Sequence, residues 1–158
     1  MEIFDSTPLV IISKLIHEGK EIIFHAKGLS MFPILRENVT IRIVPTGIQK
    51  VKINDIVLFV QNHKLLAHRV LKIMNESAEI ILICKGDTSF KKDLPVKKKD
   101  YIGIVNKYSR EGNFKSLTAP GKRLWGLAIV NTGNCWAYIF KYLIRKPENL
   151  YKRLIIKD

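Results

Sequence analysis

The chain has 158 residues, 47% of them hydrophobic and 26% charged, a composition typical of one folded domain with a small appendage at most. It excludes a disordered tail and a collagen-like repeat. With 27 Lys and Arg against 14 Asp and Glu, the net charge of +13 favours polyanionic partners such as nucleic acid, anionic lipid or an acidic peptide. Cys84 and Cys135 predict neither a disulfide scaffold nor a zinc site, and we expect two buried, reduced thiols.

The first predicted element is a short helix that begins at Ser6 or Thr7, has Pro8 at its first position and ends at Gly19. After it, short segments rich in Ile and Val alternate with turn residues, which indicates antiparallel strands. The expected strands cover residues 21–26, 39–44, 56–60, 65–74, 79–84 and 102–108. A loop over 109–121 follows. The pattern predicts a mainly β domain over 1–120 and a basic, amphipathic helical appendage over 121–158.

Residues 124–144 form an apolar stretch that is long enough to cross a bilayer. As one helix, this stretch places on a single stripe the side chains of Trp125, Ile129, Trp136, Phe140 and Leu143. Polar residues at its centre and Lys141 favour a helix that docks on the core or lies on an anionic membrane surface. We therefore expect a cytoplasmic or peripheral membrane protein, and a single pass through 124–144 is the alternative.

The segment 28–33, with the sequence Gly-Leu-Ser-Met-Phe-Pro, places a serine in a turn. Its glycine and proline bend the backbone, and such a bend exposes the Ser30 hydroxyl and directs a backbone N–H into the same space. These are the properties of a nucleophilic site. An ordinary loop serine is the alternative interpretation.

A candidate general base and two candidate carboxylates follow in chain order. His68 lies in a predicted strand, and Asp87 and Asp93 lie in a basic loop after the next strand, where a carboxylate can orient an imidazole. The alternatives are a hydrogen-bonded strand histidine and aspartates that bind turn N–H groups. The residues leave open which carboxylate contacts His68. The other three histidines show no metal-ligand spacing, so neither a metal nor a cofactor is predicted.

Together these segments resemble the signal peptidase I superfamily, which also includes the LexA-like self-cleaving repressors. The resemblance covers residues 26–105 and rests on Gly-Leu-Ser-Met-Phe-Pro at 28–33, Asn-Asp-Ile-Val at 54–57, His-Arg-Val at 68–70 and Lys-Gly-Asp at 85–87 with Asp93. A histidine at 68, where common bacterial members carry lysine, is similar to the Ser–His–Asp branch found in endoplasmic-reticulum and archaeal signal peptidases. The fold implied is an antiparallel β domain of the signal peptidase/LexA type.

The resemblance implies a serine endopeptidase with Ser30 as nucleophile, His68 as general base and Asp93 as the orienting carboxylate. Supporting roles are implied for Asp87, as a second carboxylate that shapes the site, and for Gly28, Met31, Pro33, Arg69 and Gly86. Some relatives carry a hydroxyl for the oxyanion where this chain has Gly28, so the second oxyanion donor stays open. Members of the family favour a small residue, often alanine, just before the cleaved bond.

The chain also departs from the family pattern. Signal peptidases normally carry a membrane anchor before the serine, whereas the 29 residues before Ser30 contain no spanning segment. We therefore expect cleavage of a precursor or leader peptide inside the cell or at a membrane surface. The alternative is a catalytically silent relative that binds such a peptide. Nucleic-acid binding is not favoured, because the chain lacks interleaved basic and aromatic residues and has no room for a helix-turn-helix domain before the serine.

Overall fold

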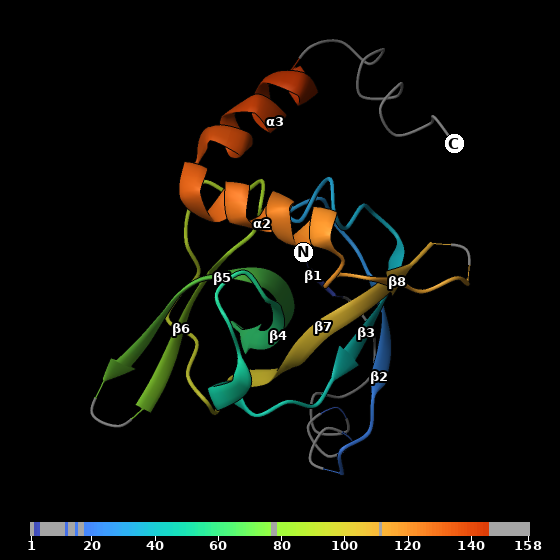
Figure 1. Cartoon of the computed structure of the whole chain (residues 1–158), viewed down its shortest axis with the longest axis vertical. Helices are drawn as coiled ribbons and strands as arrows, with labels where there is room; N and C mark the ends of the chain where they lie inside the picture. The colour runs from blue at the N-terminus through green and yellow to red at the C-terminus, as the bar shows by residue number, and fades with distance from the viewer. Residues whose placement is uncertain are drawn as a thin grey trace.

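The computed structural model describes residues 2, 3, 12, 15, 18–76, 79–110 and 112–145. Within these residues the fold is mainly β, with eight strands in one antiparallel sheet and a C-terminal helical segment (Figure 1). The elements are β1 (Glu2–Ile3), β2 (Ile22–Ala26), β3 (Val39–Val44), the 3-10 turn Ile48–Lys50, β4 (Ile56–Gln61), β5 (Lys64–Glu76), β6 (Glu79–Lys85), β7 (Tyr101–Ser109), β8 (Lys115–Ser116), α2 (Pro120–Thr132) and α3 (Cys135–Arg145).

The strands follow the order β1-β5-β4-β7-β3-β2, with β6 paired to β5 and β8 paired to β7. All six predicted strands are confirmed, because alternating burial along a segment is a local signal that the sheet reproduces. In β2, for example, Ile22 and Phe24 are buried whereas Ile23 is exposed. The two-residue strands β1 and β8 were not predicted, and β8 lies in the segment expected to be a loop.

The core lies on both faces of the sheet. In the central strand β4, Ile56 and Leu58 belong to one apolar cluster, and Val57 and Phe59 belong to the other. A strand buried on both faces has a continuous apolar sequence, which is what residues 56–60 show. The long strand β5 pairs with β4 over its first half and with β6 over its second half, so it connects the body to a projecting hairpin (Figure 1).

Most of the predicted N-terminal helix lies outside the described residues. Of that segment, Ile12 and Leu15 are described, and both are helical. Ile12 is fully buried in the core cluster that contains Phe24 and Leu35, and Leu15 packs against the same cluster.

The C-terminal apolar stretch is not the single helix that the stripe of residues predicted. It is divided at Gly133 (φ +60°) into α2 and α3, whose residues Trp125 and Trp136 meet edge to face at a centroid distance of 4.8 Å. No helix among the described residues is both long enough and apolar enough to cross a membrane. The expectation of two buried thiols is confirmed for Cys84 and wrong for Cys135, which is exposed where α3 begins after this break.

Candidate active site

Three residues from distant parts of the chain form a continuous row of hydrogen bonds. The Ser30 hydroxyl lies 3.1 Å from His68 Nε2, and His68 Nδ1 lies 2.8 Å from Asp93 Oδ2. Ser30 is in the turn between β2 and β3, His68 is in the middle of β5, and Asp93 is in the loop after β6. Both distances are within the range in which a base receives a proton from a nucleophile and a carboxylate orients the base.

Buried side chains, a glycine with positive φ and hydrogen bonds from the loop after β6 hold the turn that carries Ser30, which we call the serine turn. Met31 and Leu35 are fully buried, and Gly28 adopts a φ of +93°, a conformation that favours glycine. Thr88, in the loop after β6, donates its backbone N–H to the Ser30 carbonyl at 2.9 Å and its hydroxyl to the Leu29 carbonyl at 3.0 Å. The serine turn and the loop after β6 are therefore hydrogen-bonded to each other next to Ser30.

Gly86 allows this close approach. A Cβ atom at position 86 would lie 2.9 Å from both the Ser30 Cβ and the Ser30 carbonyl oxygen. Real Cβ atoms do not come this close to other atoms, so any side chain at this position pushes the serine turn away from the loop. The predicted supporting role of Gly86 thus corresponds to a direct contact with the nucleophile.

His68 is buried, with 6% of its surface exposed, and packs edge-on against Phe59. Burial lowers the pKa of His68 below its ordinary value of 6.5, and the hydrogen bond to Asp93 opposes part of this shift. The imidazole is therefore neutral at pH 7. Because the Asp93 carboxylate accepts the proton on Nδ1, the lone pair on Nε2 faces the Ser30 hydroxyl.

Asp93 is held in place by its own backbone. Its N–H donates to the Cys84 carbonyl at 2.9 Å, and the chain then returns beside β6 through an antiparallel bridge between Leu82 and Val96. These contacts fix a loop that would otherwise be free to move. The Asp93 side chain is 12% exposed.

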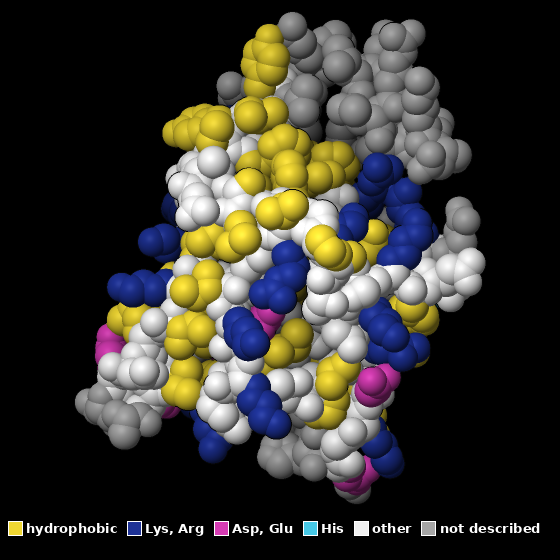
Figure 2. Space-filling model, in the orientation of Figure 1, with side chains coloured by type: hydrophobic (Ala, Val, Ile, Leu, Met, Phe, Trp, Pro, Cys, Tyr) yellow, Lys and Arg dark blue, Asp and Glu magenta, His cyan; other side chains and the backbone are white. Residues whose placement is uncertain are grey.

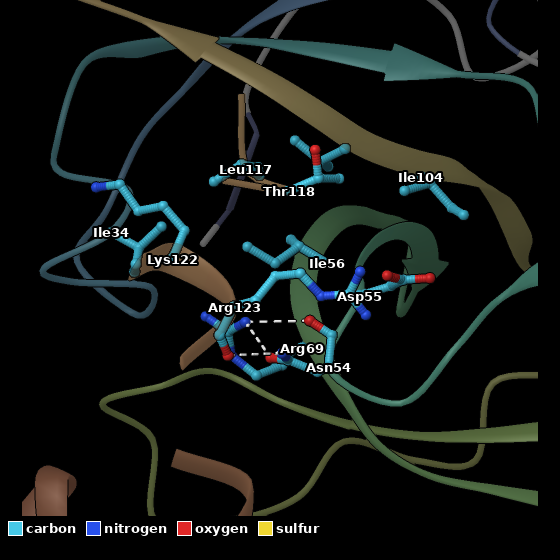
Figure 3. A pocket seen from close by; sticks show the side chains of 11 residues that line it. Ile34, Asn54, Asp55, Ile56, Arg69, Ile104, Leu117, Thr118, Lys122 and Arg123 are labelled. Carbon is cyan, nitrogen blue, oxygen red and sulfur yellow. Dashed lines mark hydrogen bonds between the residues drawn. The ribbon is translucent and has the colours of Figure 1, made fainter. Parts of the chain in front are cut away.

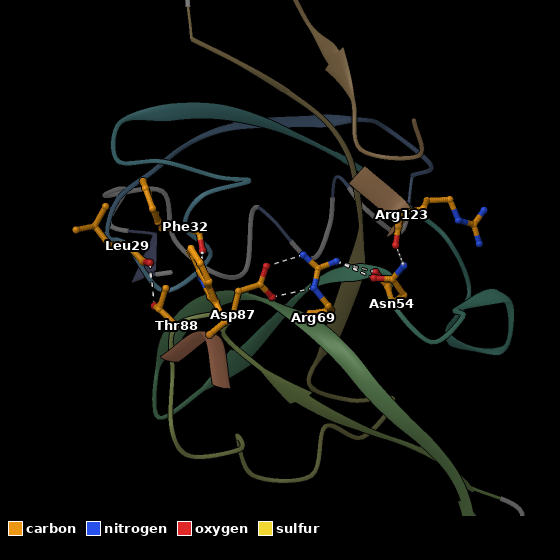
Figure 4. A network of polar contacts seen from close by, with 8 residues as sticks. Leu29, Phe32, Asn54, Arg69, Asp87, Thr88 and Arg123 are labelled. Atoms are coloured by element: carbon orange, nitrogen blue, oxygen red, sulfur yellow. Dashed lines mark hydrogen bonds and ion pairs between the residues drawn. The ribbon is translucent and has the colours of Figure 1, made fainter. Parts of the chain in front are cut away.

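The second predicted carboxylate, Asp87, contacts Arg69 and not His68. The fully buried Asp87 carboxylate accepts two hydrogen bonds from the Arg69 guanidinium, at 2.8 and 2.6 Å. Arg69 Nη1 donates to the backbone carbonyl and the side-chain oxygen of Asn54, and Asn54 donates to the Arg123 carbonyl in α2 (Figure 4). This network joins β5, the loop after β6 and α2.

Sequence reasoning missed two residues, Trp136 and Lys85, that hold the helices against this site. Trp136 of α3 donates its indole N–H to the Phe32 carbonyl at 3.0 Å, two residues beyond Ser30. The buried Lys85 donates to the Gly133 carbonyl and to the Asn134 side chain, at the corner between α2 and α3. A lysine inside an apolar strand and a tryptophan with a donor to satisfy were the available signals, but neither indicates which acceptor it binds.

Pro33, the last motif residue, is half-buried at the surface of the serine turn. Within the described part of the chain, no group of three or more His, Cys, Asp or Glu side chains is placed to hold a metal ion. Comparisons of the chain with protein-family models, with curated proteins and with solved structures gave no match.

Proposed function

We propose that this protein is a serine endopeptidase of the signal-peptidase type that cleaves a precursor or leader peptide through an acyl-enzyme. The observation that carries the proposal is the row from the Ser30 hydroxyl through His68 to the Asp93 carboxylate. The order of the motifs along an antiparallel β domain supports the same class. A peptide with alanine just before the cleaved bond is the substrate that the resemblance favours.

In the proposed reaction, Ser30 Oγ attacks the peptide carbonyl carbon while His68 Nε2 takes the hydroxyl proton. The C–N bond then breaks, and the imidazolium gives this proton to the leaving amine, so that an ester remains on Ser30. Water attacks the ester, gives a proton to His68, and releases the acid as the proton returns to the serine oxygen. Asp93 keeps the proton on Nδ1 and stabilises the imidazolium at each step.

The oxyanion of each tetrahedral intermediate needs hydrogen-bond donors at the serine turn. We assign one of them to the backbone N–H of Ser30, which belongs to the same bend as the hydroxyl. Gly28 carries no side chain and supplies no hydroxyl for this purpose. Asp87 and Arg69 support the site without touching the reacting atoms, because they fix the loop whose backbone contacts Ser30.

The proposal is tested with a serine-directed fluorophosphonate probe and peptide mass mapping of the adduct. We expect labelling at Ser30 in the wild-type protein, none in Ser30→Ala, and a large loss in His68→Ala. His25→Ala is the matched control, because His25 contacts the Thr40 hydroxyl on the exposed side of β2, away from Ser30. If folded wild-type protein is not labelled, the peptidase assignment is wrong, and a peptide-binding relative of the same fold replaces it.

We further propose that the protein works at an anionic membrane surface. Hydrophobic side chains gather over α2 and α3, with Lys and Arg side chains beside them (Figure 2). The exposed apolar residues of the two helices are Leu124, Leu127, Tyr138, Ile139 and Tyr142. Apolar and aromatic side chains next to cations are the combination that interfacial helices use.

Flotation with vesicles tests this surface. We expect the protein to bind phosphatidylcholine vesicles that contain phosphatidylserine, and a Leu124→Asp/Ile139→Asp variant to stay free. Ile53→Asp is the control, because Ile53 is about as exposed as Ile139 but lies before β4. Equal binding of the two variants would exclude α2 and α3 as the contact surface.

A further inference from the structure

A pocket with a volume of about 480 Å³ opens between the serine turn and the start of α2. This volume is within the range of about 300–1,000 Å³ that is typical of ligand pockets. The residues that define it are Pro33, Ile34 and Arg36 from the turn, and Gly121, Lys122 and Trp125 from the helix. Pro33 is three residues beyond Ser30, so their Cα atoms are separated by at most about 11 Å.

The pocket carries two cations, Arg36 and Lys122, for which the described part of the chain provides no anionic partner. Within the described residues, neither Arg36 nor Lys122 forms an ion pair, and Lys122 Nζ lies over the neutral Tyr108 ring at 5.2 Å. No residue that lines the pocket is acidic. The positive potential of the pocket is therefore not neutralised from within its walls.

Two hydrogen-bond donors at the same place are also unsatisfied. Arg36 Nη1 and Trp125 Nε1 are both buried and have no hydrogen-bond partner in the described structure. Buried donors in proteins are normally paired, because a donor removed from water and left without an acceptor destabilises the fold. Because both donor atoms are buried, an acceptor in the pocket would satisfy them once the side chains of Arg36 and Trp125 rotate toward it.

A carboxylate in the adjoining pocket, that of Asp55, is hydrogen-bonded to the backbone. Ile34 and Lys122 also line a smaller adjoining pocket, where Lys122 and Asp55 lie on opposite sides (Figure 3). The Asp55 carboxylate accepts the backbone N–H of Lys52 at 2.8 Å. Among the described residues, Asp55 forms no ion pair with Arg36 or Lys122.

We propose that the pocket of Arg36, Lys122 and Trp125 receives the carboxylate of an acidic residue of the substrate peptide. The inference rests on the proposed peptidase function and specifies its substrate class. A planar carboxylate matches the guanidinium fork, and the apolar walls formed by Pro33, Ile34 and Trp125 accept the methylene groups of a glutamate. An extended chain advances about 3.3 Å per residue and Pro33 lies at most about 11 Å from Ser30, so we expect the acidic residue within a few residues of the cleaved bond.

The test measures peptide binding by the Ser30→Ala protein, which binds without cleaving. The probes are short alanine-rich peptides that carry one glutamate at successive positions, each matched by a peptide with glutamine there, and Trp fluorescence reports binding because Trp125 lines the pocket. We expect the glutamate peptide to bind about tenfold more tightly at one or two positions. Arg36→Gln and Lys122→Gln should each remove this preference, whereas Lys98→Gln, an exposed lysine outside the pocket, should retain it.

Equal affinities for glutamate and glutamine at every position would overturn the proposal, and so would a preference that survives in both pocket variants. The comparison of the two peptides on the Ser30→Ala protein needs no pocket variant, so a folding defect of Arg36→Gln does not weaken it. Fluorophosphonate labelling of Ser30 without a glutamate preference would reject the pocket and keep the peptidase. A glutamate preference without labelling would reject the peptidase and keep the pocket.

Discussion

His68 and Arg69 are neighbours in β5, yet they serve opposite sides of the strand. His68 shares its face with Leu66 and Val70 and contacts Ser30 and Asp93, whereas Arg69 contacts Asp87 and Asn54. Each residue pairs with one carboxylate from the segment after β6. The imidazole can gain and lose a proton near neutral pH, whereas the guanidinium is permanently charged. The comparison indicates that one pair is suited to proton transfer and the other to holding the loop in position.

The largest expected difference between the two pairs is in reactivity. Asp93→Asn should lower the rate of Ser30 labelling by about 10⁴-fold, because an amide cannot hold the proton on His68 Nδ1. The free energy of unfolding of the Asp93→Asn protein should change by only about 1 kcal/mol. Labelling kinetics and urea unfolding on the same protein measure both quantities. A loss of stability in proportion to the loss of labelling would remove the distinction between the pairs.

Breaking the other pair should mainly affect stability. Arg69→Met leaves the fully buried Asp87 carboxylate without its cation, and we expect the free energy of unfolding to fall by about 3–5 kcal/mol. The double variant Arg69→Met/Asp87→Leu should recover much of this loss, since no buried charge is then unpaired. Urea denaturation of the single and double variants measures both free energies of unfolding. A double variant as unstable as the single one would show that the network around Asn54, and not the charge pair, holds the loop.

The pH dependence sharpens the role assigned to His68. Since burial lowers its pKa, the labelling rate should be half-maximal below pH 6.5 and constant above it. Stability follows the same direction: below pH 6.5 the unfolded chain takes up a proton that the folded imidazole resists, so the free energy of unfolding falls as the pH is lowered. A pH series of labelling measures the midpoint, and His25→Ala should leave it unchanged. A midpoint above 6.5 would contradict a buried neutral base.

The smallest effect is expected where α3 contacts the serine turn. Trp136→Phe removes the hydrogen bond to the Phe32 carbonyl but keeps an aromatic ring against Trp125. We expect the free energy of unfolding to fall by about 1 kcal/mol and labelling at Ser30 to slow severalfold. Thermal unfolding measures the loss of stability, and labelling kinetics measure the change in Ser30 reactivity. Unchanged labelling would show that α3 stabilises the fold without positioning the serine turn.

Local patterns explain why the sequence predicted the strands well. Alternating or continuous apolar residues identified the six longer strands, whereas β1 and β8 are two residues long and carry no pattern of their own. The helical stripe over 124–144 failed for a related reason. In a single helix the polar centre of this stretch only disfavours spanning a membrane, whereas in the structure Gly133 and its neighbours form the corner between two helices.

The sequence predicted which residues form the candidate site, but not which of them contact one another. The motifs identified Ser30, His68 and two aspartates, but which aspartate meets His68 depends on the return of the chain from β6 through the bridge at Val96. Neither the spacing of Asp87 and Asp93 nor their common sequence context contains that information. Trp136 is 104 residues from its hydrogen-bond partner Phe32 in the sequence, so this contact depends on tertiary packing alone.

Lys85, the last residue of β6, and the two loop residues that follow it perform three separate tasks. Lys85 holds the corner of the two helices, Gly86 leaves room for Ser30, and Asp87 binds Arg69. Each task belongs to one position in the chain, so a shift by one residue would put the wrong residue at all three places. An insertion or deletion here would therefore detach the helices, crowd the serine and leave Arg69 without its carboxylate in a single step. For this tripeptide, changes of length are far more damaging than most changes of side chain.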